Sequence, residues 1–431
     1  MLQRIHWCQC GQSERKAALQ RSDIVTDPAL VDRVSQILKQ VKCEGDVALR
    51  ALTEQYDGTL PESWQYDSTA LSEAGERLSA PLKQAIDTAI KNIRAFHQAQ
   101  ALPPVSPQIA PGIACELRTE PLQRVGLYVP GGSAPLISTV LMLALPAQIA
   151  GCELKVMVTP PPVNDAILYA AARCGIDRLY AIGGAQAIAA LAYGTEQVPR
   201  VDKIFGPGNR FVTEAKRQVS QQGIAIDMPA GPSEVLVIAD ELANPEFVAA
   251  DLLSQAEHGA DSQAILVTPS TDLADGVDRA LKRQLATLPR AQIANAALRQ
   301  SRTIVAQDLP EAAAISNAYA PEHLIVQTRD PRALLPVIRS AGSIFLGPWT
   351  PESVGDYASG TNHVLPTYGA ARTVSSLSLA DFQRRFTVQE LTRGGLDALG
   401  DTVITLAQAE GLEGHARAVA LRLSANREGS A

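Results

Sequence analysis

The sequence lacks paired cysteines, an excess of positive charge and a dense charged surface. Its six cysteines are scattered and none forms a Cys-x-x-Cys pair, so neither a thiolate zinc site nor a disulfide framework is indicated. The net charge of the 431 residues is −7, which argues against nucleic acid or an anionic membrane as the main partner. Charged residues make up only 19%, which suits a protein with much buried surface, including subunit interface.

The chain also lacks a secretory pattern and an uninterrupted membrane-spanning run. The first residues, MLQRIHWCQCGQSERK, have no apolar core, as a signal peptide would require. The stretch 134–152 is about long enough to cross a bilayer, but Pro146 and Gln148 interrupt it. We therefore expect a buried helix there, no membrane partner, and a cytoplasmic protein in a reducing compartment.

What the chain does contain is a repeated alternation of strand-like and helix-like segments. A chain of this length is expected to form two or more domains. From Arg124 onward, apolar runs typical of strands are followed by glycine-rich turns and helical segments, and the pattern resumes after Pro232. This alternation predicts an α/β fold made of two doubly wound, Rossmann-like units, with mostly parallel sheets.

A conventional dinucleotide fingerprint is missing from these units. The glycine turns GLYVPGGSAP, AIGGAQA and FGPGN do not match GxGxxG, and no strand-end acid follows at the usual distance. Helices that start after glycine-rich turns still bind phosphate well. From these residues alone, a phosphate-bearing ligand is expected and NAD is one choice among several.

The two ends of the chain have a different pattern. Residues 1–100 are predicted to be mainly helical, and Asp27 and Pro28 offer an N-cap and a first-turn proline before one of the helices. The prolines in 102–112 predict an extended connector and a domain boundary. The residues from about Ser378 are poor in strand signals, so we expect a helical C-terminal arm.

The stretch DLLSQAEHGAD, residues 251–261, is the first candidate for chemistry. Gln255 and His258 are three residues apart and face the same way on a helix, and Gly259 is a normal place for that helix to stop. An amide oxygen and an imidazole at a helix end could form half of a metal site. Taken alone, the stretch fits a capped, exposed helix end better.

Four of the six histidines occur in polar or glycine-rich company, whereas His6 and His97 read as structural. Glu322 and His323 stand side by side before an apolar strand, so both can serve one site only at the turn where the strand begins. A plain surface turn explains the pair about as well.

Two further motifs contain the remaining histidines. Asp356 lies in the polar segment 353–367, which also contains His363, and is a candidate ligand for a divalent ion or the centre of an Asx turn. Glu410 and His415 lie in EGLEGHA, which alone is typical of an ordinary helix N-terminus.

Taken together, these segments resemble the histidinol dehydrogenase family, the zinc- and NAD-dependent enzymes of the last steps of histidine synthesis. The resemblance runs through eight motifs over nearly the whole chain, in the family's order and spacing. They are VGLYVPGG, AIGGAQAIAALAYGT, VDKIFGPGN, IDMPAGPSEVLVIAD, ADLLSQAEHG, APEHL, GDYASGTNHVLPT and EGLEGHA.

The resemblance implies a site for one Zn²⁺ ion per subunit. The family's zinc ligands fall on Gln255, His258, Asp356 and His415. In the family the last ligand comes from the partner subunit of a homodimer, by way of the C-terminal arm. The resemblance therefore implies active sites shared between two subunits, and it gives the strand-poor arm a structural purpose.

The resemblance also implies the catalytic and binding residues. His323 would act as general base in alcohol oxidation, and Glu322 would then activate water for the second hydride transfer to NAD. Contacts to NAD are implied for Tyr128, Gln186 and Asn209. Contacts to the substrate, L-histidinol, are implied for Ser233, Gln255, His258, His323, Asp356, His363, Glu410 and His415.

The resemblance suggests how the domains divide the chain. We predict an N-terminal helical segment (1–23), a substrate and zinc domain (24–126 with 233–377), an NAD-binding domain (127–232) and the C-terminal arm (378–431). A related zinc- and NAD-dependent enzyme for another small alcohol, such as a sulfonated diol, is the alternative function. A non-catalytic metal- or nucleotide-binding protein is a third, but it predicts decay of the acid–base pair or of a ligand, and neither has occurred.

Overall fold

The computed structural model describes residues 2–21, 27–58, 64–131, 135–176, 178–228 and 231–425. The boundary predicted at residue 24 and part of the glycine loop predicted at 130–135 lie outside these ranges. The chain forms two compact units, the first comprising Met1–Gln100 with Leu122–Phe382 and the second Ala101–Pro121 with Gln383–Ala431. Among the described residues, no helix is both long and apolar enough to cross a membrane.

The first compact unit contains two six-stranded sheets, which confirms an α/β fold with two largely parallel sheets. The first sheet is parallel apart from the edge strand β2. In spatial order its strands are β2 (Gln65–Tyr66), β7 (Arg178–Ala181), β6 (Leu154–Thr159), β5 (Arg124–Tyr128), β8 (Lys203–Phe205) and β9 (Ala225–Ile226).

Helices cover both faces of the first sheet. Alternate residues of its strands point to opposite faces and pack into two separate apolar cores. Leu127 packs into one core and its neighbour Tyr128 into the other. The helices on the Leu127 side are α4 (Ser68–Glu73), α5 (Ala80–Gln98), α6 (Ile137–Ala150) and α7 (Asp165–Arg173). Those on the Tyr128 side are α2 (Pro28–Glu44), α3 (Asp46–Asp57), α8 (Gly184–Tyr193) and α9 (Arg210–Ser220).

Two of these helices confirm predictions from the sequence. Helix α2 begins as expected, since the Asp27 side chain accepts a hydrogen bond from the Ala29 backbone N–H and Pro28 occupies the first turn. Within the apolar run 134–152, residues Ile137–Ala150 form α6, which is buried almost all the way round. A helix that is apolar on every side belongs in a protein core or a membrane, and here it lies in the core.

The second sheet is parallel throughout. In spatial order its strands are β1 (Gln3–His6), β12 (Arg302–Val305), β11 (Gln263–Thr268), β10 (Glu234–Ala239), β13 (His323–Gln327) and β14 (Ser343–Leu346). The central strands β10, β11 and β13 are buried along their whole length, as expected for parallel strands covered on both faces.

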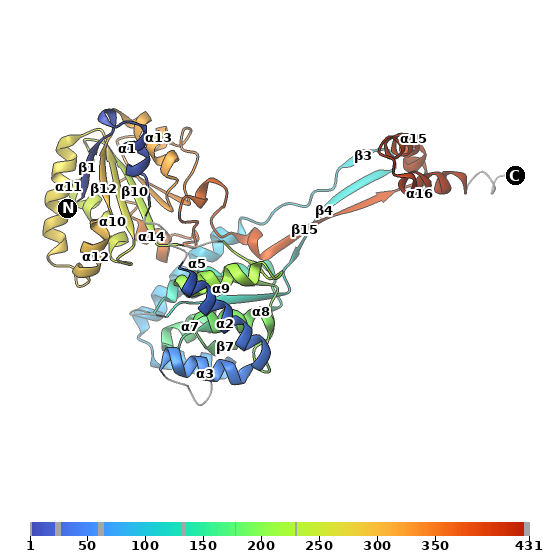
Figure 1. The fold of residues 1–431 in the computed structure, drawn as a ribbon, viewed down its shortest axis with the longest axis horizontal. Helices are drawn as coiled ribbons and strands as arrows, with labels where there is room; N and C mark the ends of the chain where they lie inside the picture. The colour runs from blue at the N-terminus through green and yellow to red at the C-terminus, as the bar shows by residue number, and fades with distance from the viewer. Residues whose placement is uncertain are drawn as a thin grey trace. The chain divides into compact units, whose positions relative to one another are not determined.

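This sheet also lies between two helical layers (Figure 1). One core is formed with α10 (Pro245–Ala256), α11 (Thr271–Leu285) and α12 (Ala291–Leu298), and the other with α1 (Gln12–Ala18) and α13 (Leu309–Tyr319). The short helix α14 (Glu352–Tyr357) follows β14. The N-terminal residues were predicted as helix, but Gln3–His6 adds an edge strand beside β12.

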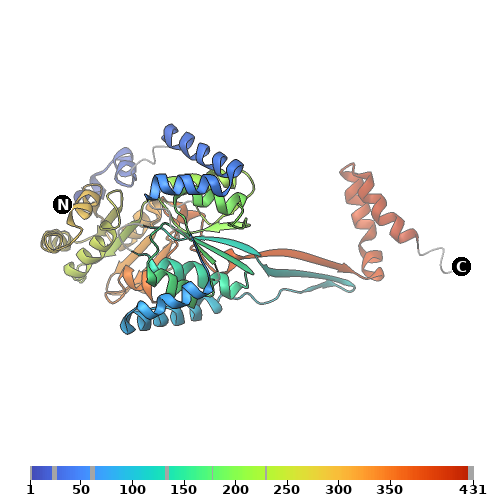
Figure 2. The same ribbon diagram turned by 90° about the horizontal axis from the view of Figure 1, so that it is seen from below.

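The second compact unit pairs two distant parts of the chain. Strand β4 (Ile113–Pro121) lies between β3 (Gln108–Ala110) and β15 (Gln383–Leu391), with antiparallel pairing on both sides. Figures 1 and 2 show β4 and β15 side by side along their length. Helices α15 (Arg393–Ala409) and α16 (Glu413–Ser424) complete the unit and pack on each other.

The strand β15 corrects the interpretation of the C-terminal arm as purely helical. It has nine residues, and only Gln383, Phe386 and Val388 are even half-buried. Because the strand has no fully buried face, its apolar alternation is weak, and the pattern from which strands are predicted is almost absent.

Candidate functional site

The predicted catalytic and metal-ligating residues of the first unit lie at the amino ends of the second sheet. Glu322 and His323 occupy the turn into β13, and Ser233 precedes the neighbouring strand β10. Helix α13 ends at Ala320, whose left-handed φ of 56° turns the chain into this position. The sequence argument that the pair must sit where the strand begins therefore agrees with the structure.

Glu322 and His323 are both buried and both fixed by the backbone of Glu234. A Glu322 carboxylate oxygen accepts a hydrogen bond from the Glu234 N–H at 2.8 Å. The His323 Nδ1 atom lies 3.0 Å from the Glu234 carbonyl oxygen, so Nδ1 carries the proton and donates. Nε2 has no hydrogen-bond partner in the structure and lies 3.7 Å from an Asp356 carboxylate oxygen. This tautomer leaves Nε2 available as an acceptor.

The predicted metal ligands of the first unit also come together. His258, Asp356 and a third residue, Glu352, place ligand atoms within 4.8 Å of one another. Gln255, one turn before His258, is fully buried, and its amide nitrogen lies 2.8 Å from a Glu352 oxygen when the amide is oriented to satisfy both groups.

Glu352 is the residue that the sequence reasoning missed. The polar segment predicted from the sequence starts at Ser353, one residue too late, and is expected to be a loop. In the structure its first residues form helix α14, so Glu352 and Asp356 are four residues apart and face the same way. The spacing E-x-x-x-D was the signal that could have identified the residue.

The electrostatics of this cluster favour a bound cation. Burial raises the pKa of Glu322 to about 8 and that of Glu352 to about 7. Burial opposes protonation of His323, but the carboxylates of Glu352, Glu322 and Asp356 outweigh it and hold the pKa of His323 well above its ordinary value. Burial therefore disfavours the charged form of two of these carboxylates, and a divalent ion bound beside them would offset that cost.

The donor set fits zinc. Imidazole nitrogen, carboxylate oxygen and amide oxygen are all ligands that zinc accepts, and no thiolate is present. The unpartnered Nε2 of His323 shows that the cluster is not saturated by the protein's own hydrogen bonds. The residues present therefore fit the metal that the resemblance implies.

His363 lies beside the cluster, on the segment after α14. Its Nδ1 atom is 2.9 Å from the Asp356 carbonyl oxygen, and its Nε2 atom is 3.4 Å from the Thr139 hydroxyl on α6. Burial lowers the pKa of His363, so its ring is neutral near pH 7. The neighbouring residue Asn362 donates a hydrogen bond from its side-chain amide to the Met142 carbonyl oxygen at 2.8 Å. Because Met142 lies on α6, this bond joins the segment to a helix that covers the first sheet.

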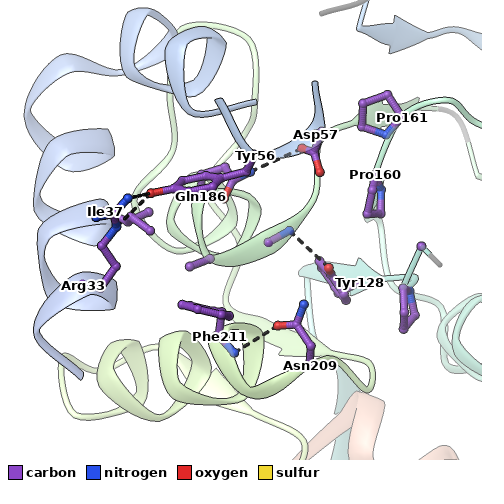
Figure 3. A pocket seen from close by; sticks show the side chains of 14 residues that line it. Arg33, Ile37, Tyr56, Asp57, Tyr128, Pro160, Pro161, Gln186, Asn209 and Phe211 are labelled. Carbon is purple, nitrogen blue, oxygen red and sulfur yellow. Dashed lines mark hydrogen bonds between the residues drawn. The ribbon is translucent and has the colours of Figure 1, made fainter. Parts of the chain in front are cut away.

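A separate pocket of about 660 Å³ lies at the carboxyl ends of the first sheet. All three residues predicted to contact NAD line it (Figure 3). Tyr128 ends β5, Gln186 lies in the first turn of α8, and Asn209 caps α9 by accepting from the Phe211 and Val212 N–H groups at 3.0 and 3.2 Å. The structure thus brings these residues into one concave site.

The glycine turn before α8 has a steric reason. A Cβ atom on Gly183 would lie 2.4 Å from Pro160, and Gly184 has a positive φ of 63°. The Gly184 N–H donates to the Tyr128 hydroxyl at 3.2 Å, and α8 has no side-chain cap. An uncapped helix start at a pocket wall offers backbone N–H groups to a phosphate.

The pocket also contains residues that the sequence did not single out. Arg33 and Asp57 come from the helical first hundred residues, and Gln186 donates to an Asp57 oxygen at 3.5 Å. The usual dinucleotide fingerprint has its acid at a strand end, whereas Asp57 comes from the end of helix α3.

The last two predicted site residues lie in the second compact unit. Glu410 ends α15, and His415 is in the first turn of α16. Both side chains are exposed within the chain. Their assignment to the metal and substrate site remains a prediction.

These features define a class of protein, an α/β enzyme with a buried glutamate–histidine pair, a cluster of side chains that could hold a metal ion and a separate pocket suited to a nucleotide. The chain belongs to the histidinol dehydrogenase family, whose model matches residues 20–423.

Known proteins similar to the chain carry the same description. A histidinol dehydrogenase from Shewanella oneidensis is 60% identical, covering 97% of the chain and 98% of the relative. One from Escherichia coli (strain K12) is 58% identical, covering 98% of each. The crystal structure of histidinol dehydrogenase from Elizabethkingia anophelis matches with a TM-score of 0.95 and 45% identity, covering 98% of each chain.

Proposed function

We propose that the chain oxidises L-histidinol through L-histidinaldehyde to L-histidine, reducing two molecules of NAD in sequence. The observation that carries this proposal is the buried pair Glu322 and His323 beside the cluster of His258, Glu352 and Asp356. Family membership over nearly the whole chain supports the choice of substrate.

Zinc would be held by Gln255, His258 and Asp356 of one chain. When bound, it would supply a Lewis acid that orients and polarises the reacting substrate. The positive charge would also offset the carboxylates that hold the pKa of His323 high. His323 would then be neutral at working pH, which a general base must be.

The first oxidation requires removal of the hydroxyl proton. Because Nδ1 of His323 donates to the Glu234 carbonyl oxygen, Nε2 is the atom that accepts this proton. The burial of the ring keeps bulk water from competing for it. Ser233 precedes β10, and the Nδ1 atom of His363 lies 2.9 Å from the Asp356 carbonyl oxygen; both residues are assigned to substrate binding.

The second oxidation requires activation of a water molecule at the aldehyde. Glu322 is assigned this role, since a pKa of about 8 lies close to neutral pH, where a general base is most effective. Its hydrogen bond from the Glu234 N–H keeps one carboxylate oxygen fixed and leaves the other to the site. One bound substrate thus meets a separate proton acceptor in each half-reaction. This assignment leaves the cysteines without a catalytic role, in keeping with the raised pKa of the buried Cys152 thiol, about 11.

NAD is assigned to the pocket at the first sheet and would accept the hydride in both steps. Tyr128, Gln186 and Asn209 line that pocket, and the uncapped start of α8 suits a pyrophosphate. The chain would then bind NAD without a GxGxxG motif, using the Gly183–Gly184 turn and residues from the N-terminal helices.

We assign the second compact unit to a homodimer in which Glu410 and His415 serve the partner's site. Within one chain α15 and α16 have almost no core, since α16 buries only Ala416. Large apolar side chains on this unit remain exposed, namely Leu102, Val105, Ile109, Leu391, Val403, Leu406, Leu412 and Leu421. A second subunit would cover these side chains.

Counting the product tests the proposed reaction. Zinc-loaded protein is given a limiting amount of L-histidinol with excess NAD, and NADH is measured by absorbance. We expect about two NADH per histidinol, because both oxidations occur before release. Turnover of a sulfonated diol without turnover of histidinol would instead support the alternative substrate. Zinc binding without any turnover would support a binding protein.

A further inference from the structure

We propose that Glu352 is a positioning residue for the metal site, which acts by fixing the side-chain amide of Gln255. The proposal rests on the zinc-dependent function proposed above. It concerns a residue outside the implied ligand set and assigns it one contact through which it works.

Glu352 is a buried carboxylate without a conventional partner. It is the first residue of α14, its side chain is 1% exposed, and it forms no ion pair with a lysine or arginine in the described part of the chain. Burying a carboxylate without a lysine or arginine partner costs free energy, which its other contacts must offset. With the Gln255 amide oriented so that both groups are satisfied, its nitrogen lies 2.8 Å from one Glu352 oxygen and 3.3 Å from the other.

Gln255 needs such a contact because its amide has two different ends. Only the oxygen can ligate a cation, and rotation by half a turn would present the NH₂ group instead. Gln255 is completely buried at the end of α10, where water cannot hold the amide. An ionised carboxylate accepts hydrogen bonds and cannot donate, so ionised Glu352 selects the orientation with the Gln255 nitrogen towards itself and the oxygen away.

The arrangement follows a general feature of metal sites. Groups behind the ligands fix their orientation, and their loss typically weakens metal affinity by about 10–100-fold. Glu352 has two alternative roles that the experiment must distinguish. One is direct ligation of the metal, since Glu352 lies within the cluster of potential ligand atoms. The other is a contact with His323, whose Nδ1 is 3.9 Å away. Neither of them passes through Gln255.

A double-mutant cycle separates these roles, with the zinc dissociation constant measured by chelator competition. We expect Glu352→Met to weaken zinc binding by about 10–100-fold in the wild-type background and to have little further effect in a Gln255→Ala background. Glu352→Gln should recover much of the affinity, because its amide oxygen can still accept from Gln255. An equal loss in both backgrounds would overturn the proposal and identify a direct or purely electrostatic role.

Asp240→Asn is the control for removal of a buried acid from the same sheet. Asp240 is 5% exposed, lies at the opposite end of β10 and accepts from the Leu242 and Arg329 N–H groups. Its zinc affinity should equal that of the wild type, and circular dichroism should show each metal-free variant folded. If Asp240→Asn weakened zinc as much as Glu352→Met, positioning would be wrong. Absence of zinc binding by the wild type would instead contradict the proposed function.

Discussion

The two sheets of the first unit have the same strand order but present their sites at opposite ends. In the first sheet, β5, β6 and β7 follow one another outward, and β8 and β9 extend on the other side of β5. In the second, β10, β11 and β12 run outward, and β13 and β14 extend on the other side of β10. The order reverses between β5 and β8 and between β10 and β13. Both sites lie at these reversal points.

The first sheet follows the usual rule and the second does not. Ligands of such sheets normally bind beyond the carboxyl ends of the strands, and there the pocket with Tyr128 and Asn209 is found. Glu322, His323 and the cluster of His258, Glu352 and Asp356 instead lie at the amino ends of the second sheet. Because the connecting helices run against the strands, carboxyl ends meet helix N-termini and amino ends meet helix C-termini.

This difference matches the charge of the two proposed ligands. Helix N-termini carry partial positive charge and favour phosphate, whereas C-termini carry partial negative charge and favour cations. The start of α8 borders the nucleotide pocket, and the end of α10 carries Gln255. One strand order can thus present helix N-termini, suited to an anionic cofactor, at one end of its strands and helix C-termini, suited to a metal ion, at the other.

The largest effect on the oxidation rate is expected from substitution of His323 or Glu322, at the amino ends of the second sheet. His323→Asn should slow histidinol oxidation by about 10²–10⁴-fold, the usual contribution of a general base, while added histidinaldehyde is still partly oxidised. Glu322→Gln should show the reverse selectivity. NAD affinity, measured by fluorescence titration, should not change in either variant. Equal loss of both half-reactions in both variants would contradict the division of roles.

A second prediction is that another subunit completes the site at the amino ends of the second sheet. The pocket of the first sheet needs no residue from another subunit. His415→Ala should weaken zinc retention, measured after dialysis by metal analysis, and should leave NAD affinity unchanged. Mixing this variant with Asp356→Ala should restore one working site per hybrid dimer, because one site then has all its ligands. Unmixed samples of each variant are the controls, and hybrids that stay inactive would show that the ligand is not shared.

The sequence predicted the elements better than their relation in space. Helix α2 could be placed from its cap and apolar spacing, and α6 from its uniform apolar run, because those signals are local. Strand β15 has no fully buried face, and β1 is a four-residue edge strand, so neither carries a strong pattern.

The candidate site shows the same limit. The family motifs indicated Gln255, His258 and Asp356, but not that Glu352 would lie against the Gln255 amide. That contact joins two helices far apart in the sequence, and spacing within one segment cannot reveal it. Nor could periodicity show whether the site lies at the amino or the carboxyl ends of the strands, since the apolar pattern along a strand is the same towards either end.

The smallest expected effect concerns Asn209 at the carboxyl edge, where structural and binding roles coincide. Asn209 caps α9, and loss of such a cap costs about 1 kcal/mol. Asn209→Ala should therefore lower both the unfolding free energy and the affinity for NAD. Asn209→Ser keeps a capping oxygen but removes the amide that faces the pocket, so it should lower NAD affinity with little change in denaturant stability. Zinc affinity should be unaffected in both, because the metal cluster belongs to the other sheet. If Asn209→Ser bound NAD as the wild type does, the residue would be a helix cap only, and the pocket assignment would rest on Tyr128 and Gln186.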